Sequence, residues 1–231
     1  MFTCVRLSRK TSVFFKSVRQ LSSKKCIIYT TAVKDPFYNL AFEEWMFNKV
    51  DFTKTNCLFI WSSNPTVVIG RHQNPWRECK VDDAIADGVN ICRRSSGGGA
   101  VYHDLGNLNF TFFNEKSEYN TKHNLGIITQ GLQKHWPHLD VAVNKRDDIL
   151  LNTSHKISGT AARLGRRNCY HHCTLLVSTN KLNLMKYLYP NEMNLISIAT
   201  ESVRSSVMNL EDEDSRINCE NVLRTVAQFY A

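Results

Sequence analysis

The residues best suited to chemistry lie in two segments, residues 93–107 (RRSSGGGAVYHDLGN) and residues 156–159 (KISG). Three consecutive glycines remove every Cβ from one face of a loop, so a ligand can contact backbone N–H groups directly. The paired arginines before them supply fixed positive charge for a phosphate or carboxylate, and Lys156 adds a further cation. These residue types predict a site for an anionic ligand that carries a phosphate.

Familiar phosphate-loop and nucleophile motifs do not account for the glycine run. The pattern Gly-x-Gly-x-x-Gly fails because position 102 is Tyr, and no Gly-Lys-Ser/Thr follows the glycines. No Gly-x-Ser-x-Gly segment is present, so serine hydrolysis has no support. The alternative is a glycine-rich hairpin turn that binds nothing. Two arginines and a Tyr-His-Asp run beside the glycines favour a ligand loop over that alternative.

The glycine loop is expected to join two strands, which would form a cradle at the end of a sheet. Apolar residues predict a strand over 89–93, and alternation of apolar and polar side chains predicts a half-buried strand over 108–112. Asp35 and Pro36 are typical of a helix start, and Phe37, Leu40 and Trp45 follow at helical spacing up to about residue 50.

The whole pattern predicts an α+β fold, a mixed and mainly antiparallel sheet with flanking helices, because strands and helices mix without strict βαβ alternation. Further helices are expected over residues 74–88, 122–136, 183–188 and 221–229. Further strands are expected over residues 26–31, 58–61, 66–69, near 141, and over 149–151, 156–159 and 174–178.

The formal charge of +8 is concentrated at the N-terminus. The first 25 residues hold seven of the 29 basic residues and no acid, which leaves 22 basic against 21 acidic residues in the remainder. No basic stripe remains for nucleic acid. A leader rich in Arg, Lys and Ser is typical of a mitochondrial transit peptide, which we assign to residues 1–25; the alternative is a disordered basic tail. We therefore expect the mitochondrial matrix.

Eight cysteines occur without a Cys-x-x-Cys pair, and free thiols suit a reducing compartment. Only residues 169–173 (CYHHC) could suggest zinc. In a strand, His171 and Cys173 would face one side and His172 the other, which suits tetrahedral coordination poorly. No metal site is expected.

Five segments in order resemble the lipoate–protein ligase A family, most of all its mitochondrial lipoyltransferase branch. They are residues 70–76 (GRHQNPW), 93–107, 156–161 (KISGTA), 171–176 (HHCTLL) and 202–210 (SVRSSVMNL). The likeness extends over about residues 27–230, and five motifs together are far more specific than one glycine run.

The resemblance implies the catalytic-domain fold shared by biotin and lipoate protein ligases, related to class II aminoacyl-tRNA synthetases. It implies that lipoyl-adenylate (lipoyl-AMP) is bound as substrate, without a permanent cofactor, and that Lys156 is the catalytic cation at its phosphate and acyl carbonyl. The residues it assigns to lipoyl-AMP binding are Arg94, Ser96, Gly97, Gly98, Gly99, Tyr102, His103, Arg146, Ala161, His172, Thr174 and Thr200.

Several assignments leave an alternative open. Lys156 has the alternative of a surface lysine, and Arg146 that of a solvated charge cluster. His172 fits a ligand contact or a core position equally well. Asp104 either extends the ligand wall or orients His103 and the loop. Candidates for an acyl tunnel, with plain core as the alternative, are Trp61, Val67, Val68 and Ile69.

The leading hypothesis is a lipoyltransferase that acylates a lysine of the lipoyl domains of E2 subunits in 2-oxoacid dehydrogenase complexes, with the glycine-cleavage H protein as a further acceptor. One alternative is a full ligase that uses ATP and Mg²⁺; another is a non-catalytic binder of lipoyl-AMP or lipoyl domains. A cysteine-dependent octanoyltransferase is weaker, because Cys173 has an ordinary strand pattern. We expect a monomer that binds neither nucleic acid nor membrane.

The domain expectation is one catalytic domain over residues 26–231. The family usually carries a smaller C-terminal accessory domain, which is linked in ligases to adenylation. We expect that domain to be absent here, which puts ATP-dependent activation in doubt.

Overall fold

A seven-stranded sheet forms the centre of the protein. The computed structural model describes residues 3–5, 14–21, 24–188, 199, 200, 202, 203 and 205–231. The strand order is β1-β2-β3-β4-β8-β13-β12, and every neighbouring pair is antiparallel except β3 and β4. These strands are Thr3–Val5 (β1), Phe14–Leu21 (β2), Lys24–Thr30 (β3), Thr55–Trp61 (β4), Asn107–Glu115 (β8), Asn168–Leu176 (β13) and Thr160–Leu164 (β12). The predicted mixed, mainly antiparallel sheet is confirmed.

Two three-stranded sheets flank the large one. The first has the order β6-β5-β7, with β5 parallel to β6 and antiparallel to β7; the second is the antiparallel sheet β11-β10-β9. Their strands are Thr66–Ile69 (β5), Asn90–Arg93 (β6), Val101–His103 (β7), Val141–Val143 (β9), Ile149–Leu151 (β10) and His155–Lys156 (β11). The glycine loop therefore joins two strands, as predicted, with the short strand β7 as an addition.

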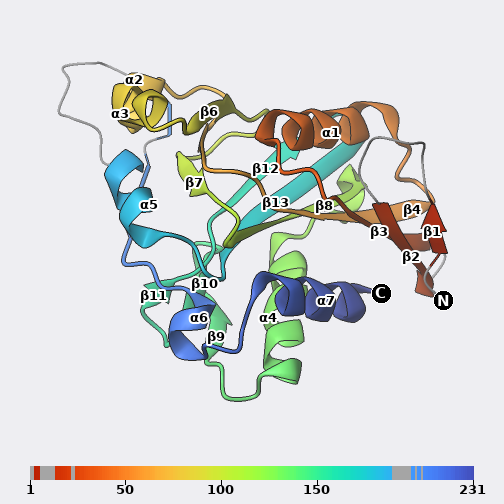
Figure 1. Cartoon of the computed structure of the whole chain (residues 1–231). Helices are drawn as coiled ribbons and strands as arrows, with labels where there is room; N and C mark the ends of the chain where they lie inside the picture. The colour runs from red at the N-terminus through yellow and green to blue at the C-terminus, as the bar shows by residue number, and fades with distance from the viewer. Residues whose placement is uncertain (1–2, 6–13, 22–23, 189–198, 201, 204) are drawn as a thin grey trace.

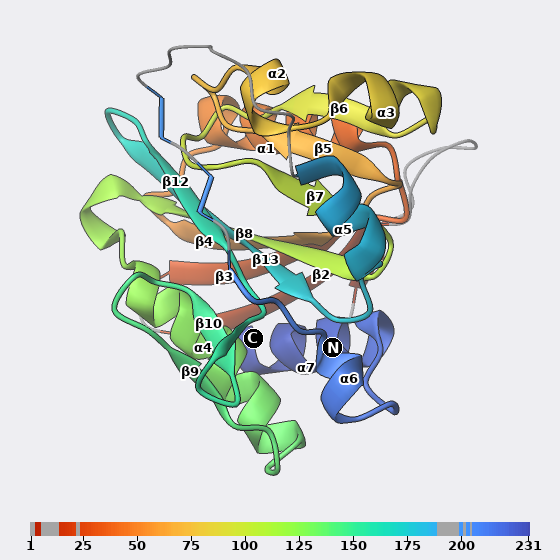
Figure 2. The ribbon, with the colours of Figure 1, turned by 90° about the vertical axis from the view of Figure 1, so that its left-hand side faces the viewer.

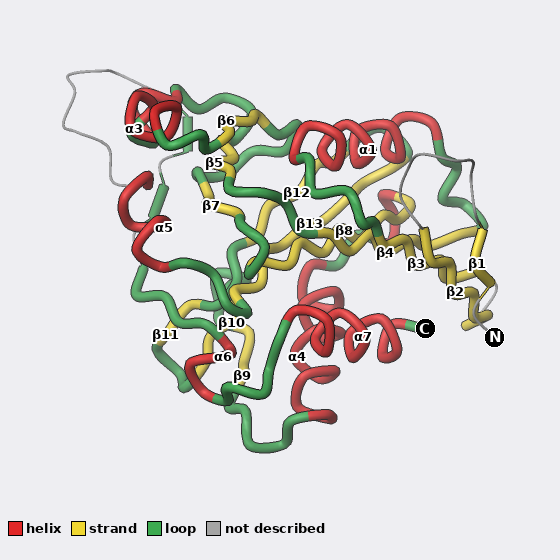
Figure 3. Tube along the Cα trace, in the orientation of Figure 1, coloured by secondary structure: helices red, strands yellow, loops and turns green. Residues whose placement is uncertain are grey.

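Helices cover both faces of the large sheet. Figures 1 and 3 show α1 on one face, and α4 and α7 on the other. Figure 2 shows α2, α3 and α5 around the β5–β7 sheet. The helical segments are Pro36–Lys49 (α1), Pro75–Glu78 (α2), Val81–Ala86 (α3), Thr121–His135 (α4), Lys181–Leu188 (α5), Leu210–Glu213 (α6), Cys219–Tyr230 (α7) and the 3₁₀ turn Lys116–Glu118 (η1). No described helix has the length and apolar character needed to span a membrane.

Strand β8 is buried on both faces, so the prediction of a half-buried strand was wrong. It pairs with β4 on one side and β13 on the other, between two layers of helices. Its polar residues Asn109 and Thr111 are 4% and 0% exposed. They pair with buried partners: Thr111 donates to Glu43 at 2.7 Å, and Asn109 donates to the Trp61 carbonyl at 3.4 Å. The alternation in the sequence marks a polar face that points into the protein, not to water.

Helix α1 begins where the sequence predicted, but its buried face is not the predicted apolar one. The Asp35 carboxylate accepts from the N–H groups of Phe37 and Tyr38, with Pro36 in the first turn. Phe37 and Trp45 are more than half exposed. The buried residues of the helix are Pro36, Asn39, Glu43, Met46 and Phe47.

The single helix predicted over residues 74–88 is divided into α2 and α3. Cys79 between them is extended and buried. The N–H of Lys80 donates to the carbonyl of Tyr187 in α5, at 2.9 Å. A helix cannot continue through a residue whose backbone donor is taken by another element, so packing against α5 interrupts this helix.

The segment assigned to a transit peptide contains β1 and β2 at the edge of the large sheet. Strand β2 pairs antiparallel with β3, with Val18 opposite Ile27. The transit-peptide assignment concerns import and stays a prediction.

Candidate active site

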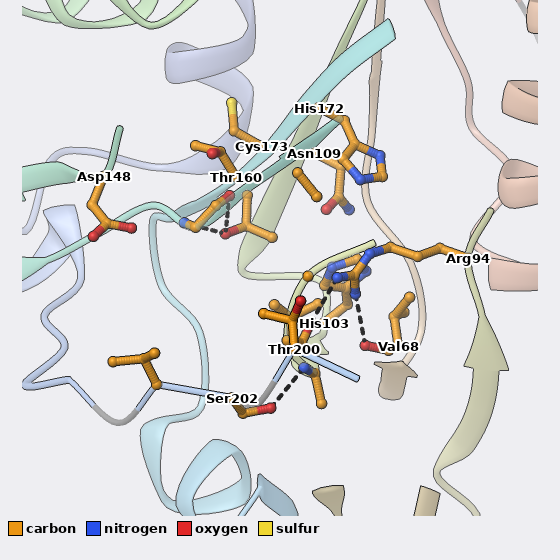
Figure 4. A pocket seen from close by; sticks show the side chains of 18 of the residues that line it. Val68, Arg94, His103, Asn109, Asp148, Thr160, His172, Cys173, Thr200 and Ser202 are labelled. Atoms are coloured by element: carbon orange, nitrogen blue, oxygen red, sulfur yellow. Dashed lines mark hydrogen bonds between the residues drawn. The ribbon is translucent and has the colours of Figure 1, made fainter. Parts of the chain in front are cut away.

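A cavity of about 250 Å³ opens between the β6–β7 loop, strands β12 and β13 and the turn from β9 to β11 (Figure 4). One side of the cavity is the glycine-loop wall, formed by Arg94, Gly98, Gly99 and Ala100. Another side is the lysine wall, formed by Arg146, Asp148, Lys156 and Gly159. The predicted site residues that line the cavity are Arg94, Gly98, Gly99, His103, Arg146, Lys156, Ala161, His172, Thr174 and Thr200.

Arg94 holds the glycine loop in place from inside. Its side chain is buried, and Nη2 donates to the carbonyls of Gly97 and Gly99 at 2.5 and 2.7 Å. Nη1 donates to the Val68 carbonyl at 3.2 Å, and Nε donates to Ser96 Oγ at 3.0 Å. Burial lowers the pKa of Arg94 to about 10, so it stays cationic at neutral pH. Most of its donors therefore bind the protein's own backbone.

Arg93 faces away from the cavity, because neighbouring residues of a strand point to opposite sides. Its Nη1 donates to the carbonyls of Gly70, Arg71 and Gln73. The prediction that both arginines offer charge to a ligand was thus wrong for Arg93, which supports the 70–73 turn. Arg94 lines the cavity while it supports the glycine loop, and its contact with a ligand stays a prediction.

The glycine loop keeps backbone donors available. Among the described residues, none of the hydrogen bonds uses the N–H groups of Gly97, Gly98 or Gly99. Gly98 has φ +87°, and a Cβ there would lie 3.0 Å from Arg94 Nη2. A Cβ at Gly70 would lie 2.1 Å from the Gly98 carbonyl oxygen. Glycine is therefore required at position 98 for the backbone conformation and at position 70 for close packing, whereas ligand contact with the loop backbone stays a prediction.

His172 lies on the cavity wall with both ring nitrogens engaged. Nδ1 is 3.0 Å from the buried carboxylate of Glu43, and Nε2 is 2.8 Å from Ser96 Oγ. Thr111 donates to the same carboxylate, and Arg94 donates to the same hydroxyl. These contacts fit an imidazole that donates from Nδ1 and accepts at Nε2. His172 thus lies on the cavity wall and is held by buried groups, and its contact with a ligand stays a prediction.

His103 lines the cavity as a neutral ring. Burial, with further repulsion from Arg94 and His172, lowers its pKa to about 3. Neither ring nitrogen has a hydrogen-bond partner among the described residues, and the ring packs edge-on against Trp61. A buried imidazole without a partner is costly, so His103 has donor and acceptor capacity to offer a ligand.

The lysine wall presents a side-chain cation held by one carboxylate. Lys156 Nζ lies 2.7 Å from Asp148 Oδ1, with the two side chains 23% and 14% exposed. Asn144 Oδ1 accepts the N–H groups of Arg146 and Asp148, which fixes the turn that carries them. Arg146 is exposed and lines the cavity. Both cations thus lie where the sequence predicted them, and Asp148 is an addition.

Thr174 and Gly159 connect the lysine wall to the large sheet. Thr174 Oγ1 accepts the N–H of Gly159 at 3.0 Å, and the Thr174 N–H donates to the Gly159 carbonyl at 3.0 Å. Ala161 lies near the glycine loop, 3.5 Å from the position of a Cβ at Gly98.

Of the residues predicted to bind lipoyl-AMP, three do not line this cavity: Ser96, Gly97 and Tyr102. Ser96 and Gly97 accept hydrogen bonds from Arg94. Tyr102 points to the opposite side of β7 from His103, into the core of the small sheet beside Tyr187. Asp104 accepts the N–H groups of Gly106 and Asn180, so it has the structural role that was one of its alternatives.

The four tunnel candidates divide by strand alternation. Trp61 and Val68 line the cavity, whereas Val67 and Ile69 are buried in the core of the small sheet. Cys173 packs in the main core and also lines the cavity, and burial raises the pKa of its thiol to about 12. A thiolate nucleophile is therefore disfavoured at this position.

A second cavity of about 130 Å³ adjoins the first. Both are lined by Ala100, Val101, Lys156, Gly159, Thr174, Ser202 and Val203. The remaining lining of the second cavity is mostly apolar and includes Tyr102, Leu176, Leu184 and Leu188. The site is thus a two-chambered cavity with a lysine at the shared wall.

Comparison with known proteins agrees with this geometry. The family model of the lipoyl protein ligase A/B catalytic domain matches residues 35–231. The chain belongs to this family. It is 45% identical over 205 residues to the mitochondrial lipoyl amidotransferase LIPT1 of Mus musculus, and 43% identical over 208 residues to that of Homo sapiens. These matches cover 89% and 90% of the chain but 55% and 56% of the relatives, so the chain spans about half their length.

A solved structure of a related protein shares the fold. The crystal structure of P. falciparum LipL1 in complex with lipoate matches with a TM-score of 0.74 and 31% identity, over 88% of this chain and 60% of that one. The α+β fold implied by the resemblance is therefore confirmed.

Sequence reasoning missed several residues of this family member's site, chiefly Glu43, Asp148 and Ser202. Glu43 is four residues after Asn39 on α1, and both are buried. The spacing of these two polar residues, one helical turn apart, was the signal in the sequence. It was hidden by the apolar pattern of Phe37 and Trp45, which are exposed in the structure. In the sequence, Asp148 follows Lys145, Arg146 and Asp147 and is consistent with a solvated charge cluster. The fold shows that its partner is Lys156.

Proposed function

We propose that the protein transfers a lipoyl group from lipoyl-AMP to the side chain of a lysine in a lipoyl domain. The observation that carries the proposal is the position of Lys156 on the wall shared by two cavities. A mixed anhydride has two arms that meet at a phosphate and a carbonyl, and a cation at that junction can bind both. The N–H groups of Gly97, Gly98 and Gly99, which bind no acceptor among the described residues, are further donors for the same charges.

The reaction requires no enzyme nucleophile. The acceptor lysine, as a free amine, attacks the acyl carbonyl carbon; the C–N bond forms, and the bond from that carbon to the phosphate oxygen breaks. AMP leaves with the electron pair, and the nitrogen of the new amide gives its proton to solvent water. Lys156 stabilises the charge that develops on the carbonyl oxygen and on the leaving phosphate. The high pKa of the Cys173 thiol is consistent with direct transfer.

The two cavities suit the two arms of the donor. We assign the acyl arm to the first cavity, whose lining includes Leu40, Trp61 and Val68. We assign the adenine to the second cavity, where apolar side chains can pack against a flat ring. Arg146, exposed on the lysine wall, is the candidate for contact with the AMP phosphate or ribose.

The remaining parts of the proposal follow from the family resemblance. The acceptors are E2 lipoyl domains and the glycine-cleavage H protein, and the donor is a substrate, with no permanent cofactor. We propose a monomer of the mitochondrial matrix, with residues 1–25 as its import signal and residues 26–231 as its catalytic domain, and with neither nucleic acid nor membrane as partner.

The test is transfer from synthetic lipoyl-AMP to an apo lipoyl domain, followed by intact-mass spectrometry of the domain. One lipoyl group is expected on the parent domain, and none on a control domain whose acceptor lysine is replaced by Arg. Binding of lipoyl-AMP without any gain of mass would contradict transferase activity and favour a non-catalytic binder.

An ATP-dependent ligase is the second candidate, favoured by the ligases that name the family. It would make lipoyl-AMP from lipoate and MgATP as substrates. Release of pyrophosphate with turnover in the presence of lipoate would establish the ligase; transfer from lipoyl-AMP without pyrophosphate release would establish the transferase.

A further inference from the structure

The segment of residues 70–78, which contains the 70–76 motif, has no role in the proposed reaction, although two of its side chains are buried close to the cavity. Gln73 and Glu78 are 3% and 5% exposed. Neither lines either cavity. Both contact Ser202, which lines both cavities.

Ser202 joins the loop that carries it to the glycine loop. Its Oγ accepts the N–H of Ala100 at 2.8 Å. A Cβ at Gly99 would lie 2.9 Å from Ser202 Cα, so the two backbones approach as closely as glycine allows. Because Ser202 binds the N–H of Ala100, that donor is withdrawn from any ligand, while those of Gly98 and Gly99 stay available.

Glu78 determines which way the Ser202 hydroxyl points. A serine hydroxyl has one hydrogen to donate, and here it donates to Glu78 Oε2 at 2.6 Å. The same oxygen accepts the Ser202 N–H at 3.3 Å. With its hydrogen directed at Glu78, the hydroxyl presents its lone pairs to Ala100.

The side-chain amide of Gln73 bridges Gly70 and Thr200. Oε1 accepts the N–H of Gly70 at 2.9 Å, and Nε2 donates to the Thr200 carbonyl at 3.0 Å. Arg93 in turn binds the carbonyls on either side of the 70–73 turn. The turn, the glycine loop and residues 200 and 202 thus form one hydrogen-bonded unit.

We infer that Gln73 and Glu78 are positioning residues that act through Ser202 to set the wall shared by the two cavities. This inference rests on the proposed function, because lipoyl-AMP is the ligand that would span both cavities. The contact with Glu78 shapes the binding site but touches no reacting atom. Its loss is therefore expected to weaken binding of lipoyl-AMP and to leave the chemical step nearly unchanged.

The experiment measures affinity for lipoyl-AMP by calorimetry, and KM and kcat for transfer, in four variants and the parent. Glu78→Ala and Ser202→Ala should each weaken binding about tenfold, the effect of losing one charge-assisted hydrogen bond. Glu78→Gln keeps an acceptor oxygen and should stay within about threefold of the parent. The double variant Glu78→Ala/Ser202→Ala should be no weaker than either single one, because both remove the same contact. In all of them kcat at saturation should change less than about twofold.

Asp82→Asn is the matched control, since Asp82 is an exposed acid on the adjacent helix α3; it should bind as the parent does. Parental affinity of Glu78→Ala, additive losses in the double variant, or a fall in kcat at constant KM would each overturn the inference. If Glu78→Ala does not fold, Ser202→Ala decides: parental affinity there overturns the inference equally. A parent that binds lipoyl-AMP without transferring it would contradict only the proposed reaction.

Discussion

The two sides of the cavity use their cations in opposite ways. On the glycine-loop wall, Arg94 is buried and most of its donors bind backbone carbonyls. On the lysine wall, Lys156 is partly exposed and held by the single carboxylate of Asp148. Figure 4 shows Arg94 and Asp148 on opposite sides of the cavity. An arginine with fixed planar donors suits a structural task, whereas a compact ammonium with one partner can turn to a ligand.

The largest effect should come from Arg94→Ala, which tests the structural side. Removal would leave the buried carbonyl of Val68 and the partly buried carbonyls of Gly97 and Gly99 without this donor, at a cost of about 3 kcal/mol or more in the free energy of unfolding. The matched control is Arg93→Ala. Arg93 is exposed, so water can replace its guanidinium at the carbonyls that it binds. This variant should cost about 1 kcal/mol or less. Urea unfolding measures both, and equal losses would refute the assignment of separate roles.

Lys156→Ala tests the catalytic side. Transfer at saturating lipoyl-AMP should fall about a hundredfold, or about 3 kcal/mol, as for a lost oxyanion donor. Unfolding should change by about 1 kcal/mol or less, because the ion pair is partly exposed to solvent. Circular dichroism and urea unfolding provide the folding control, and Lys145→Ala, at an exposed lysine of the turn between β9 and β10, is the matched variant. A folded Lys156→Ala protein with the parental rate would show that Lys156 is not catalytic.

Acid should lower the free energy of unfolding through His103, which lines the cavity. Its pKa in the folded protein is about 3, below the roughly 6.5 of an unfolded histidine, so the unfolded chain binds the proton first. The contribution of His103 to the free energy of unfolding is full above about pH 6.5 and is lost as the pH falls toward 3. Between pH 6.5 and 5 the loss is about 2 kcal/mol, at 1.36 kcal/mol per pH unit.

His171, which is also buried with its pKa lowered to about 3, adds a loss in the same direction. Unfolding by urea at several pH values should therefore give a slope of about two protons. His103→Phe should halve that slope, while the exposed variant His123→Gln should leave it unchanged. A parental slope in His103→Phe would contradict the assigned cause.

The smallest effect is expected for Asp148→Asn, which removes the carboxylate that holds Lys156. The ammonium would lose its orientation but keep its charge, so transfer should fall about tenfold, or about 1.4 kcal/mol. Because Asp148 acts through Lys156, the double variant with Lys156→Ala should be no slower than Lys156→Ala alone. Rates measured at saturating donor decide this, and independent losses would argue for a separate role of Asp148.

Local signals predicted elements better than they predicted which side chains face inward. Asp35 and Pro36 marked the start of α1 correctly, because capping depends on neighbours in sequence. The inward face of that helix includes Asn39 and Glu43, which no apolar pattern indicates. Lys80 shows the same limit, since its N–H donates to Tyr187, more than a hundred residues away in the chain.

Residue types alone indicated where the backbone could approach a ligand and where cations were available. The glycines at positions 98 and 99 and Lys156 before a Ser-Gly pair are visible in the sequence. The partner of each charged group became known from the fold. Arg94 binds carbonyls of its own loop, Lys156 pairs with Asp148, and Glu78 binds Ser202, 124 positions away in the chain. The physical reason is that a buried polar group must find a partner, and packing, not sequence distance, determines which partner is within reach.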